Sequence, residues 1–430
     1  MKYLPIEKKL FEKNRKKVSG LLAPSSLLVL NSNDIYPTSS DGNLNFKQHS
    51  DIFYLSGVDQ EESILVMFPD ASEPKHREIL FLKETNETIA IWEGEKLSKE
   101  SAFTTSGIST VYWLDQFETI FKTLMSEAEH IYINTNEHLR AKVETETRED
   151  RFIKWCKEAY PAHSFKRLSP IMHNVRAVKE PEEIELMQKA CDITESAFKR
   201  VLEFIKPGVW EYEIEAELIH EFIRKRSDGF AYTPIIASGF NACVLHYIEN
   251  NQQVKDGDLI LMDIGAEYAN YDADLTRCVP GNGRFSPRQK EVYNAVLRVQ
   301  REAIQLLRPG TSLKEYHVEV GKLMENELLG LKLIDKTDIK NQKPEWPAYK
   351  KYFMHGTSHY IGLDTHDVGS WVEPIQAGNV FTCEPGIYIP EESLGVRIEN
   401  DLVVTDAAPF DLMKNIPVEI EEIEGLMNRS

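Results

Sequence analysis

The sequence predicts a mixed α/β (α+β) protein with an N-terminal domain at residues 1–172 and a C-terminal domain at residues 173–430. Its 430 residues are enough for two or three domains with their own cores. The first part alternates short apolar runs, typical of strands, with helical stretches, which favours a sheet flanked by helices. After Ser169-Pro170 long amphipathic helices dominate. The runs expected to be strands are residues 25–32, 51–57, 63–68, 78–82, 88–94 and 130–135.

Composition excludes several classes of protein. The net charge of -19 argues against a nucleic-acid partner, because phosphate contacts need a basic surface. No run approaches the roughly 18 apolar residues of a membrane span, so we expect no membrane partner. The N-terminus lacks the apolar core of a signal peptide, and the five scattered cysteines form no CxxC pair. Reduced thiols in a cytoplasmic protein are the simplest interpretation.

The C-terminal half contains two segments with the same order of elements. Each has a helix, a Pro-Gly step, a second helix and then a strand with a carboxylate in it. Gly257 and Gly378 lie 121 residues apart, and so do Asp263 and Glu384. This suggests an internal duplication with a site at a pseudo-twofold interface, and chance similarity of two helix-strand units is the alternative. The helices are expected at residues 181–206, 211–225, 287–308 and 312–328.

Each strand pair of this half carries two acids. Asp263 lies inside the apolar run LILMDIG and Asp274 follows 11 residues later, while Glu384 and Glu399 are 15 residues apart. Directly opposed hairpin residues are an odd number apart when the loop between the strands has an even number of residues, so both acids of a pair can face one point. Opposed like charges destabilise a sheet unless a cation lies between them. A solvent-facing acid at a strand end is the alternative, which fits Asp263 poorly. The rivals of Glu399, reached by a register slip, are Asn400 and Asp401.

Three of the twelve histidines fall within twelve residues between the strand pairs, which favours function over isolated polar groups. Four carboxylates and one imidazole carry a charge of about -4, and burying that charge unpaired is prohibitive. Two divalent cations would cancel it, and mostly oxygen donors suit Mn²⁺, Mg²⁺, Co²⁺ or Zn²⁺. Two such ions can activate water and polarise a carbonyl, which predicts a hydrolase. The three histidines are His355, His359 and His366.

Taken together, these segments resemble the pita-bread metallopeptidases, which include methionine aminopeptidase, prolidase and aminopeptidase P. Residues 355–369 (HGTSHYIGLDTHDVG), 238–250, 48–57 and 91–94 are each similar to segments of bacterial-type Xaa-Pro aminopeptidase (aminopeptidase P). The resemblance covers nearly the whole chain and implies an N-terminal creatinase/aminopeptidase-P-like domain before a pita-bread domain, with a pseudo-twofold antiparallel sheet and flanking helices. The family's metal ligands are matched in order by Asp263, Asp274, His359, Glu384 and Glu399.

The resemblance implies hydrolysis of the bond between the first residue of a peptide and a proline at position 2. Two cations, Mn²⁺ foremost with Co²⁺ or Zn²⁺ as alternatives, would be bridged by a hydroxide. Glu384 would be both a ligand and the proton-handling carboxylate. His246 and His366 would bind the substrate and stabilise the tetrahedral intermediate. His355 would support the site and bind substrate.

The same resemblance assigns roles outside the ligand set. Arg397 would act in catalysis by pairing with an acid or the substrate, and Tyr388 would line the substrate pocket, with a structural role as the alternative for both. The family often forms homodimers or homotetramers in which the N-terminal domain of one subunit borders another's site. Asp41 and Trp92 are candidates for that contact, although Asp41 could equally cap a loop.

Two alternatives remain open. A prolidase shares the ligands but cleaves only dipeptides, and Ser358, where prolidases tend to have glycine, favours the aminopeptidase. An inactive pita-bread scaffold would be expected to lose ligands, whereas all five are present. The segments 370–378 and 390–395 are short for the family, so the preferred peptide length stays open.

Overall fold

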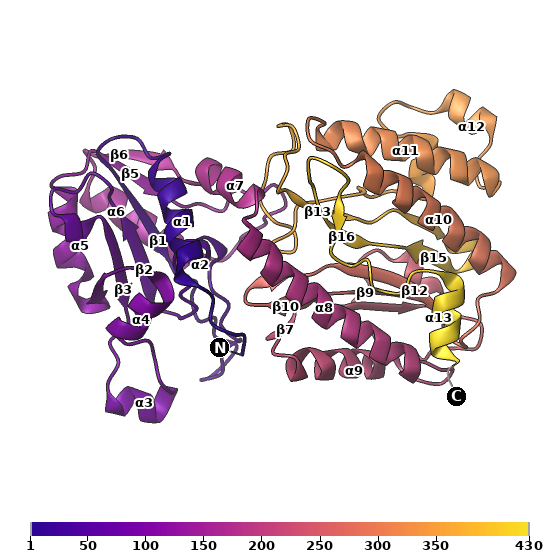
Figure 1. Ribbon diagram of the computed structural model, residues 1–430, viewed down its shortest axis with the longest axis horizontal. Helices are drawn as coiled ribbons and strands as arrows, with labels where there is room; N and C mark the ends of the chain where they lie inside the picture. The colour runs from indigo at the N-terminus through magenta and orange to yellow at the C-terminus, as the bar shows by residue number, and fades with distance from the viewer. Residues whose placement is uncertain (1, 429–430) are drawn as a thin grey trace. The chain divides into compact units, whose positions relative to one another are not determined.

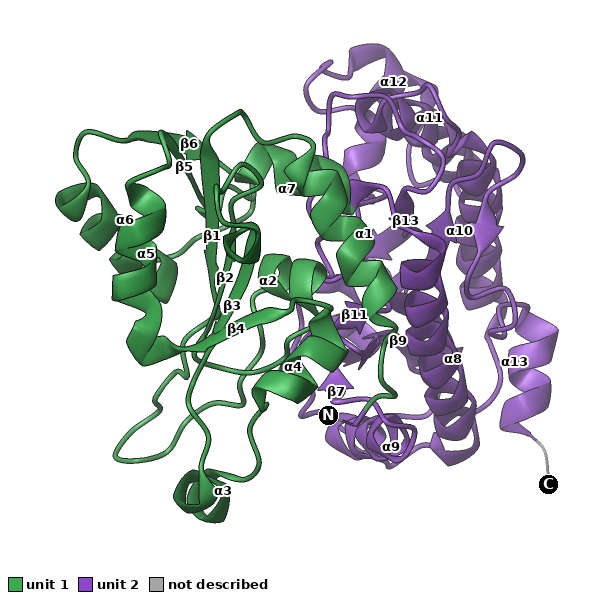
Figure 2. Ribbon diagram, turned by 60° about the vertical axis from the view of Figure 1, so that its left-hand side comes forward, with its two compact units in different colours: residues 1, 3–176 green, residues 2, 177–430 purple. Residues whose placement is uncertain are grey.

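The computed structural model describes residues 2–428 and divides the chain into two compact units, coloured separately in Figure 2. One unit comprises residues 3–176, and the other begins at Ala177 and includes Lys2. The two units therefore meet in sequence at residues 176 and 177, against an expected boundary at 172 and 173. Among the described residues, no helix combines the length and the apolarity needed to cross a membrane.

The unit of residues 3–176 is built on a six-stranded mixed sheet with the order β4-β3-β2-β1-β5-β6 (Figure 1). Strand β1 pairs antiparallel with β2 and parallel with β5, so the chain changes sides of β1 between β4 and β5. The strands are β1 (Ser26–Asn31), β2 (Ser63–Met67), β3 (Glu78–Leu82), β4 (Thr110–Trp113), β5 (His130–Ile133) and β6 (Ser164–Arg167). The helices are α1 (Lys8–Ser19), α2 (Ser50–Ser56), α3 (Glu87–Glu93), α4 (Lys99–Ser106), α5 (Phe117–Met125), α6 (Arg148–Ala159) and α7 (Ser169–Ala177).

Alternate side chains of the central strands form one apolar core of this unit. Leu27 and Val29 of β1 lie in the same cluster as Ile131 of β5, because every second side chain of a strand points to one face. Helices α5 and α6 cover that face with Phe121 and Phe152, whose rings meet edge to face with centroids 5.9 Å apart.

Two of the apolar runs that the sequence predicts as strands are helices, so those two predictions are wrong. Residues 51–57 lie in α2, where the His49 side chain accepts a backbone N–H of the first turn and Gly57 ends the helix in the left-handed conformation. Residues 88–94 lie in α3, whose N-terminus is capped by Asn86. A run of about six apolar residues has no period that distinguishes a buried strand from a short helix, so the capping residues decide.

The second unit contains two helix pairs of similar lengths, in agreement with the predicted duplication. In the view of Figure 1 the strands lie between the two pairs. The first helix of each pair begins with proline in its first turn and a capping box, which explains why the sequence predicts these starts closely. The pairs are α8 (Pro181–Phe204) with α9 (Glu211–Arg224) and α10 (Pro287–Leu306) with α11 (Leu313–Gly330), and the remaining helices are α12 (Lys336–Asn341) and α13 (Ile420–Met427).

The strands of this unit form antiparallel pairs, which together with the helices confirms the predicted fold class. The sheet orders are β11-β10-β7, β12-β9-β8, β13-β16-β17 and β14-β15. The strands are β7 (Gly229–Phe230), β8 (Ile235–Ser238), β9 (Leu259–Ile264), β10 (Ala266–Tyr268), β11 (Tyr271–Asp272), β12 (Leu275–Pro280), β13 (Val380–Cys383), β14 (Gly386–Ile389), β15 (Leu394–Arg397), β16 (Asn400–Val403) and β17 (Phe410–Asp411).

Both strand pairs that carry acids are interrupted beside those acids. The first breaks at Gly265, where a β-carbon would lie 1.7 Å from the carbonyl oxygen of Ala273. The second breaks at Glu384 and Pro385, because proline has no N–H to continue the ladder. Glu399 lies in the matching gap between β15 and β16. The acids of the second pair therefore project from gaps in the ladder rather than from regular strand positions.

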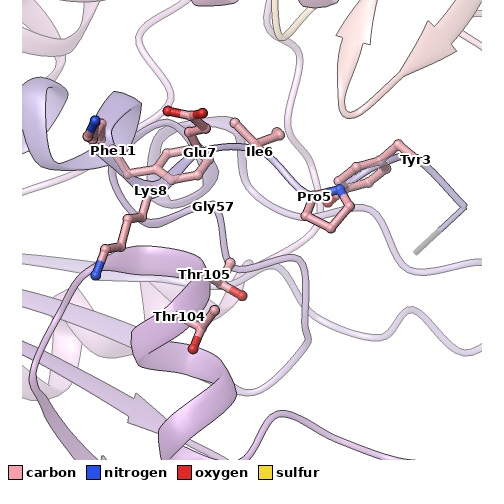
Figure 3. Close-up of a pocket in the computed structure, with 10 residues that line it drawn as sticks. Tyr3, Pro5, Ile6, Glu7, Lys8, Phe11, Gly57, Thr104 and Thr105 are labelled. Atoms are coloured by element: carbon pink, nitrogen blue, oxygen red, sulfur yellow. The ribbon is translucent and has the colours of Figure 1, made fainter.

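Gly57 provides a test of packing in the first unit. It has a φ of 66°, and a β-carbon there would lie 2.2 Å from the ring of Phe11; both residues border a cavity of about 340 Å³ (Figure 3). We expect Gly57→Ala to destabilise the unit by more than the roughly 1–2 kcal/mol of left-handed strain alone. Gly107→Ala is the matched control, because Gly107 ends α4 with a φ of 77° and faces only the flexible side chain of Glu12. Urea unfolding measures both losses, and equal values would contradict the clash.

Candidate metal centre

Five ligand-type side chains converge between the two halves of the second unit. One ligand atom each from Asp274, His359 and Glu399 lies within 4.8 Å of the others. His359 Nε2 lies 3.5 Å from an Asp274 oxygen and 3.6 Å from Oε1 of Glu384. Asp263 joins the cluster through the hydroxyl of Tyr232, which lies 2.6 Å from Oδ1 of Asp263 and 2.6 Å from Oδ1 of Asp274.

The strand register explains how the acids meet and corrects one detail. Asp263 pairs with Thr276 of β12 and not with Asp274. Asp274 precedes Thr276 by two residues, just before β12 begins. The odd separation therefore predicts the correct face of the sheet but not direct opposition. Glu384 and Glu399 do lie opposite each other, between the pairs Cys383–Asn400 and Gly386–Arg397.

The charge of this cluster calls for cations. Burial, together with the Asp263 and Asp401 carboxylates, raises the pKa of Asp274 well above its ordinary value. Burial and the neighbouring Asp274 and Glu384 raise the pKa of Glu399 in the same way. These buried carboxylates repel one another, so positive charge placed among them lowers their free energy. Oxygen donors with one imidazole are the donors that borderline divalent ions take, so this donor set fits a divalent metal.

His359 is oriented to present a lone pair to this cluster. Its Nδ1 lies 2.9 Å from the carbonyl oxygen of Tyr360. A carbonyl can only accept, so Nδ1 carries the proton and the neutral ring has its lone pair on Nε2. The Nε2 atom is the one that faces Asp274 and Glu384. A backbone partner that fixes the tautomer in this way is typical of metal-binding histidines.

Arg397 and Thr276 link Asp263, Glu399 and Tyr388 through a network of hydrogen bonds. Arg397 contacts an oxygen of Asp263 and donates from Nε to the Thr276 hydroxyl at 3.0 Å. Thr276 donates in turn to Oε2 of Glu399 at 2.6 Å. Arg397 also donates to the Tyr388 hydroxyl at 2.9 Å. Arg397 and Tyr388 are therefore fixed by contacts within the site, and each is buried.

His355 is held as a neutral ring. Its Nδ1 lies 2.7 Å from the carbonyl of Gly356, so Nδ1 carries the proton and Nε2 accepts from the Tyr388 hydroxyl at 2.7 Å. Burial, and then the Arg397 charge, lower the pKa of His355 to about 3. The same Nδ1 lies 3.6 Å from Oε2 of Glu384.

The other two histidines are exposed. The ring of His366 lies against that of His359, with centroids 4.5 Å apart and planes at 79°. His246 lies in a turn, close enough to His355 to contribute to lowering its pKa. Both side chains can therefore reach a molecule in solvent, unlike the buried Asp274, His359 and Glu399. Asp41 and Trp92 belong to the other unit, where both are exposed.

The rival ligands are engaged elsewhere. The Asn400 side chain accepts from Arg277 at 2.8 Å and donates to Asp411 at 2.7 Å. Asp401 is fully buried and accepts the backbone N–H of Asp274 at 3.0 Å, so it fixes the backbone of Asp274.

Sequence reasoning missed two residues of the site. Tyr232 lies before β8 in a segment with no local signal, so its position beside Asp263 follows only from the fold. Thr276 is two residues after Asp274, and strand alternation already places both side chains on one face. That parity argument was sufficient to find it.

Comparison with known proteins also indicates a metallopeptidase. The family model for metallopeptidase family M24 matches residues 185–406, and the aminopeptidase P N-terminal domain model matches residues 11–132. The chain belongs to metallopeptidase family M24. As a metallopeptidase of this family it has a divalent metal site, and Asp274, His359 and Glu399 form a group that could hold a metal ion.

Relatives match along nearly the whole chain. The Xaa-Pro aminopeptidase of Haemophilus influenzae is 34% identical over 100% of this chain and 99% of its own, and that of Escherichia coli is 32% identical over 98% of each. A solved structure of a putative aminopeptidase P from Bacillus anthracis has a TM-score of 0.90, 33% identity and 98% coverage of both chains. Zn-substituted E. coli aminopeptidase P in complex with product has a TM-score of 0.87, 31% identity and 99% coverage of both.

Tyr232 gives a test of the site's geometry. Burial and the two acids raise the pKa of Tyr232 well above its ordinary value, so the hydroxyl keeps its single proton and donates it to one of the two carboxylates at a time. We expect Tyr232→Phe to weaken metal binding roughly 10- to 100-fold, because the acids lose the group that orients them. Tyr293→Phe is the control, since the buried Tyr293 hydroxyl donates only to the carbonyl of Val418, at 2.8 Å. Calorimetric titration of metal-depleted protein with Mn²⁺ measures both, and equal affinities would refute the orienting role.

Proposed function

We propose that the chain removes the N-terminal residue from peptides whose second residue is proline. The observation that carries this proposal is the buried cluster of acids with His359, on a chain whose whole length aligns with Xaa-Pro aminopeptidases. The alternative of an inactive scaffold is disfavoured, because repulsion among these acids would destabilise a protein that binds no metal.

Asp263, Asp274, His359, Glu384 and Glu399 would hold two divalent cations. Four ionised carboxylates balance the charge of two such cations, which supports a count of two rather than one. Mn²⁺ is the first choice for mostly oxygen donors, with Co²⁺ and Zn²⁺ as alternatives. Bound cations of this kind lower the pKa of water and polarise a carbonyl group.

Glu384 is the carboxylate best placed to move a proton. Its side chain is 19% exposed, against 7% for Asp274, and its two oxygens face His359 and His355 at 3.6 Å each. A partly exposed carboxylate can take a proton from water and pass it to the departing amine, which deeply buried acids cannot do as readily. Asp263, in contact with Arg397 and Tyr232, would act as a ligand only.

The three histidines that are not ligands would have different roles toward the substrate. His246 and His366 are exposed and can donate an N–H to the oxygen of the scissile bond as negative charge develops there. His355 is partly exposed beside Glu384 and would also face the substrate, whereas Tyr388 is fully buried and holds the His355 ring through a hydrogen bond. The neutral His355 ring adds no charge that would compete with the cations. Arg397 positions Asp263, Thr276 and Tyr388 rather than contacting the peptide.

A peptide assay with Mn²⁺ tests the proposal. We expect release of the first residue only when proline follows it, and faster turnover of Arg-Pro-Pro than of Gly-Pro; cleavage of the dipeptide alone would indicate a prolidase. Asp263→Asn should lower kcat/KM by at least about 100-fold, because it removes a ligand charge. The control is Asp256→Asn, since Asp256 is exposed and bonds only to Asn282. Equal activity of the two variants would contradict the ligand assignment.

We also propose that the chain forms a homodimer or homotetramer through its N-terminal domain, at residues 1–172. Helix α3 carries Ile91 and Trp92 side by side, with 80% and 83% of their surfaces exposed. Large apolar side chains that adjoin on one short helix favour a partner surface over solvent, by roughly 1.5–3 kcal/mol for each one buried. Asp41, exposed in a loop of the same domain, is a further candidate for this contact.

Light scattering coupled to gel filtration tests this self-association. The double substitution Ile91→Ser and Trp92→Ser should shift the protein to a smaller oligomer or a monomer. Leu139→Ser is the control, because Leu139 is 83% exposed in another segment. An unchanged mass for the double variant would exclude α3 from the interface.

A further inference from the structure

The unit of residues 3–176 contains a second cavity, polar and distinct from the metal centre. Its volume is about 480 Å³, within the range of about 300–1,000 Å³ typical of small-molecule sites. It is lined by residues 31–33 after β1, residues 134–136 after β5 and residues 147–150 at the start of α6, elements labelled in Figure 1.

The position of this cavity in the sheet is that of a ligand site. Strands β1 and β5 are parallel neighbours, so their carboxyl ends meet at one edge. The chain adds β2, β3 and β4 on one side of β1 and then crosses to add β5 and β6 on the other. The cavity lies where the direction of strand addition reverses, and open α/β sheets bind ligands outside the carboxyl ends of strands at such a reversal.

One wall of the cavity carries a cation that no carboxylate of the described residues contacts directly. Arg148 is partly buried, and the structure gives its guanidinium one hydrogen bond, to the neutral hydroxyl of Ser32 at 3.2 Å. Burial lowers the pKa of Arg148, and the nearby carboxylates of Glu62, Asp34 and Glu149 offset this only in part. Among the described residues it forms no ion pair within 4.0 Å, whereas Arg151, on the next turn of α6, pairs with Asp34. A desolvated guanidinium of this kind gains most from a carboxylate, which it can bind through two parallel N–H groups.

The adjacent residue supplies an acceptor without a cation. Oε2 of Glu149 accepts the backbone N–H and the side-chain amide of Asn31, at 3.1 and 2.9 Å. Oε1 is buried and accepts no hydrogen bond of normal geometry, although the backbone N–H of Asn134 is directed at the same carboxyl. Burial raises the pKa of Glu149 to about 7, the behaviour of a carboxyl with no positive partner.

The other charged groups around the cavity are already satisfied. Glu146 pairs with Lys154. Asp150 accepts from the side chain and the backbone N–H of Thr147 in the capping box of α6. Glu144 is exposed to solvent. Among the described residues, Arg148 and Glu149 therefore each lack a direct ion-pair partner, and both line one cavity.

We propose that this cavity binds a small zwitterion, a free α-amino acid or a short peptide, with its carboxylate on Arg148 and its ammonium group on Glu149. A simple anion would leave Glu149 unpaired and lie against its carboxyl group. A metal cation would be repelled by Arg148. A zwitterion compensates both charges at once, and the amide side chains of Asn31 and Asn134, each nearly fully buried, line the same space.

Isothermal titration calorimetry on the full-length chain tests this site. Chelator-treated protein is used so that peptides are not turned over. The probes are L-alanine, L-leucine, L-proline and Gly-Pro, with N-acetyl-leucine and leucine amide as analogues that lack one charge each. We expect the wild-type protein to bind at least one zwitterion, and both leucine analogues to bind roughly 10- to 100-fold more weakly than leucine, which is the value of one charged hydrogen bond.

Variants assign the binding to the cavity. Arg148→Met and Glu149→Gln should each weaken binding of the zwitterion at least tenfold, and Arg148→Lys, which keeps the charge, should restore part of the loss. Arg151→Met is the matched control, because Arg151 lies on the same helix outside the cavity. All four should retain the wild-type thermal unfolding temperature within a few degrees and full peptidase activity, so a failure here is distinct from a failure of the proposed function.

Three results would overturn the proposal. The first is no binding of any zwitterion to the wild-type protein. The second is equal binding of leucine and N-acetyl-leucine, which would indicate a plain anion site. The third is wild-type affinity in both Arg148→Met and Glu149→Gln, which would place the binding elsewhere in the molecule.

Discussion

Mutual repulsion among four clustered carboxylates, two of them buried and two partly exposed, is the constraint around which the second unit is organised. Asp274 and Glu399 have raised pKa values because each is buried beside other acids. A fold that places such groups together gains nothing from them unless cations lie among them. Two contacts reduce that cost: the Tyr232 hydroxyl lies between two acids, and the Arg397 charge lies against Asp263. The lone pair of His359 does not reduce it, but is turned to where a cation would bind.

Breaks in the strands allow the backbone to bring these acids together. Gly265 lets the first strand pair bend where the chain approaches Ala273 too closely for any side chain. Pro385 stops the second ladder directly after Glu384, while the register on either side still holds Glu384 opposite Glu399. A continuous ladder would direct alternate residues to two faces. A gap lets acids of both pairs turn toward one point between the halves.

The sequence predicted the second unit well because its signals are local. Proline and capping residues mark the starts of α8 and α10, and the parity of strand spacing places Asp263 and Asp274 on one face. It failed at residues 51–57 and 88–94, where a short apolar run has no period and the caps at His49 and Asn86 decide. Tyr232 could not be predicted, because its contacts to Asp263 and Asp274 join segments more than 30 residues apart.

The two units treat buried carboxylates differently, and the difference indicates where ligands are needed. Asp51 of the first unit is buried beside Arg176, at 2.7 Å, and its pKa falls despite burial because the chain supplies the counter-cation. Glu149 is partly buried and Asp274 is buried, but the chain places no cation in direct contact with either, and their pKa values rise. In a structural ion pair the chain itself supplies both charges. Where the chain supplies only one charge, a bound ligand of opposite charge stabilises it, which is what distinguishes a binding site.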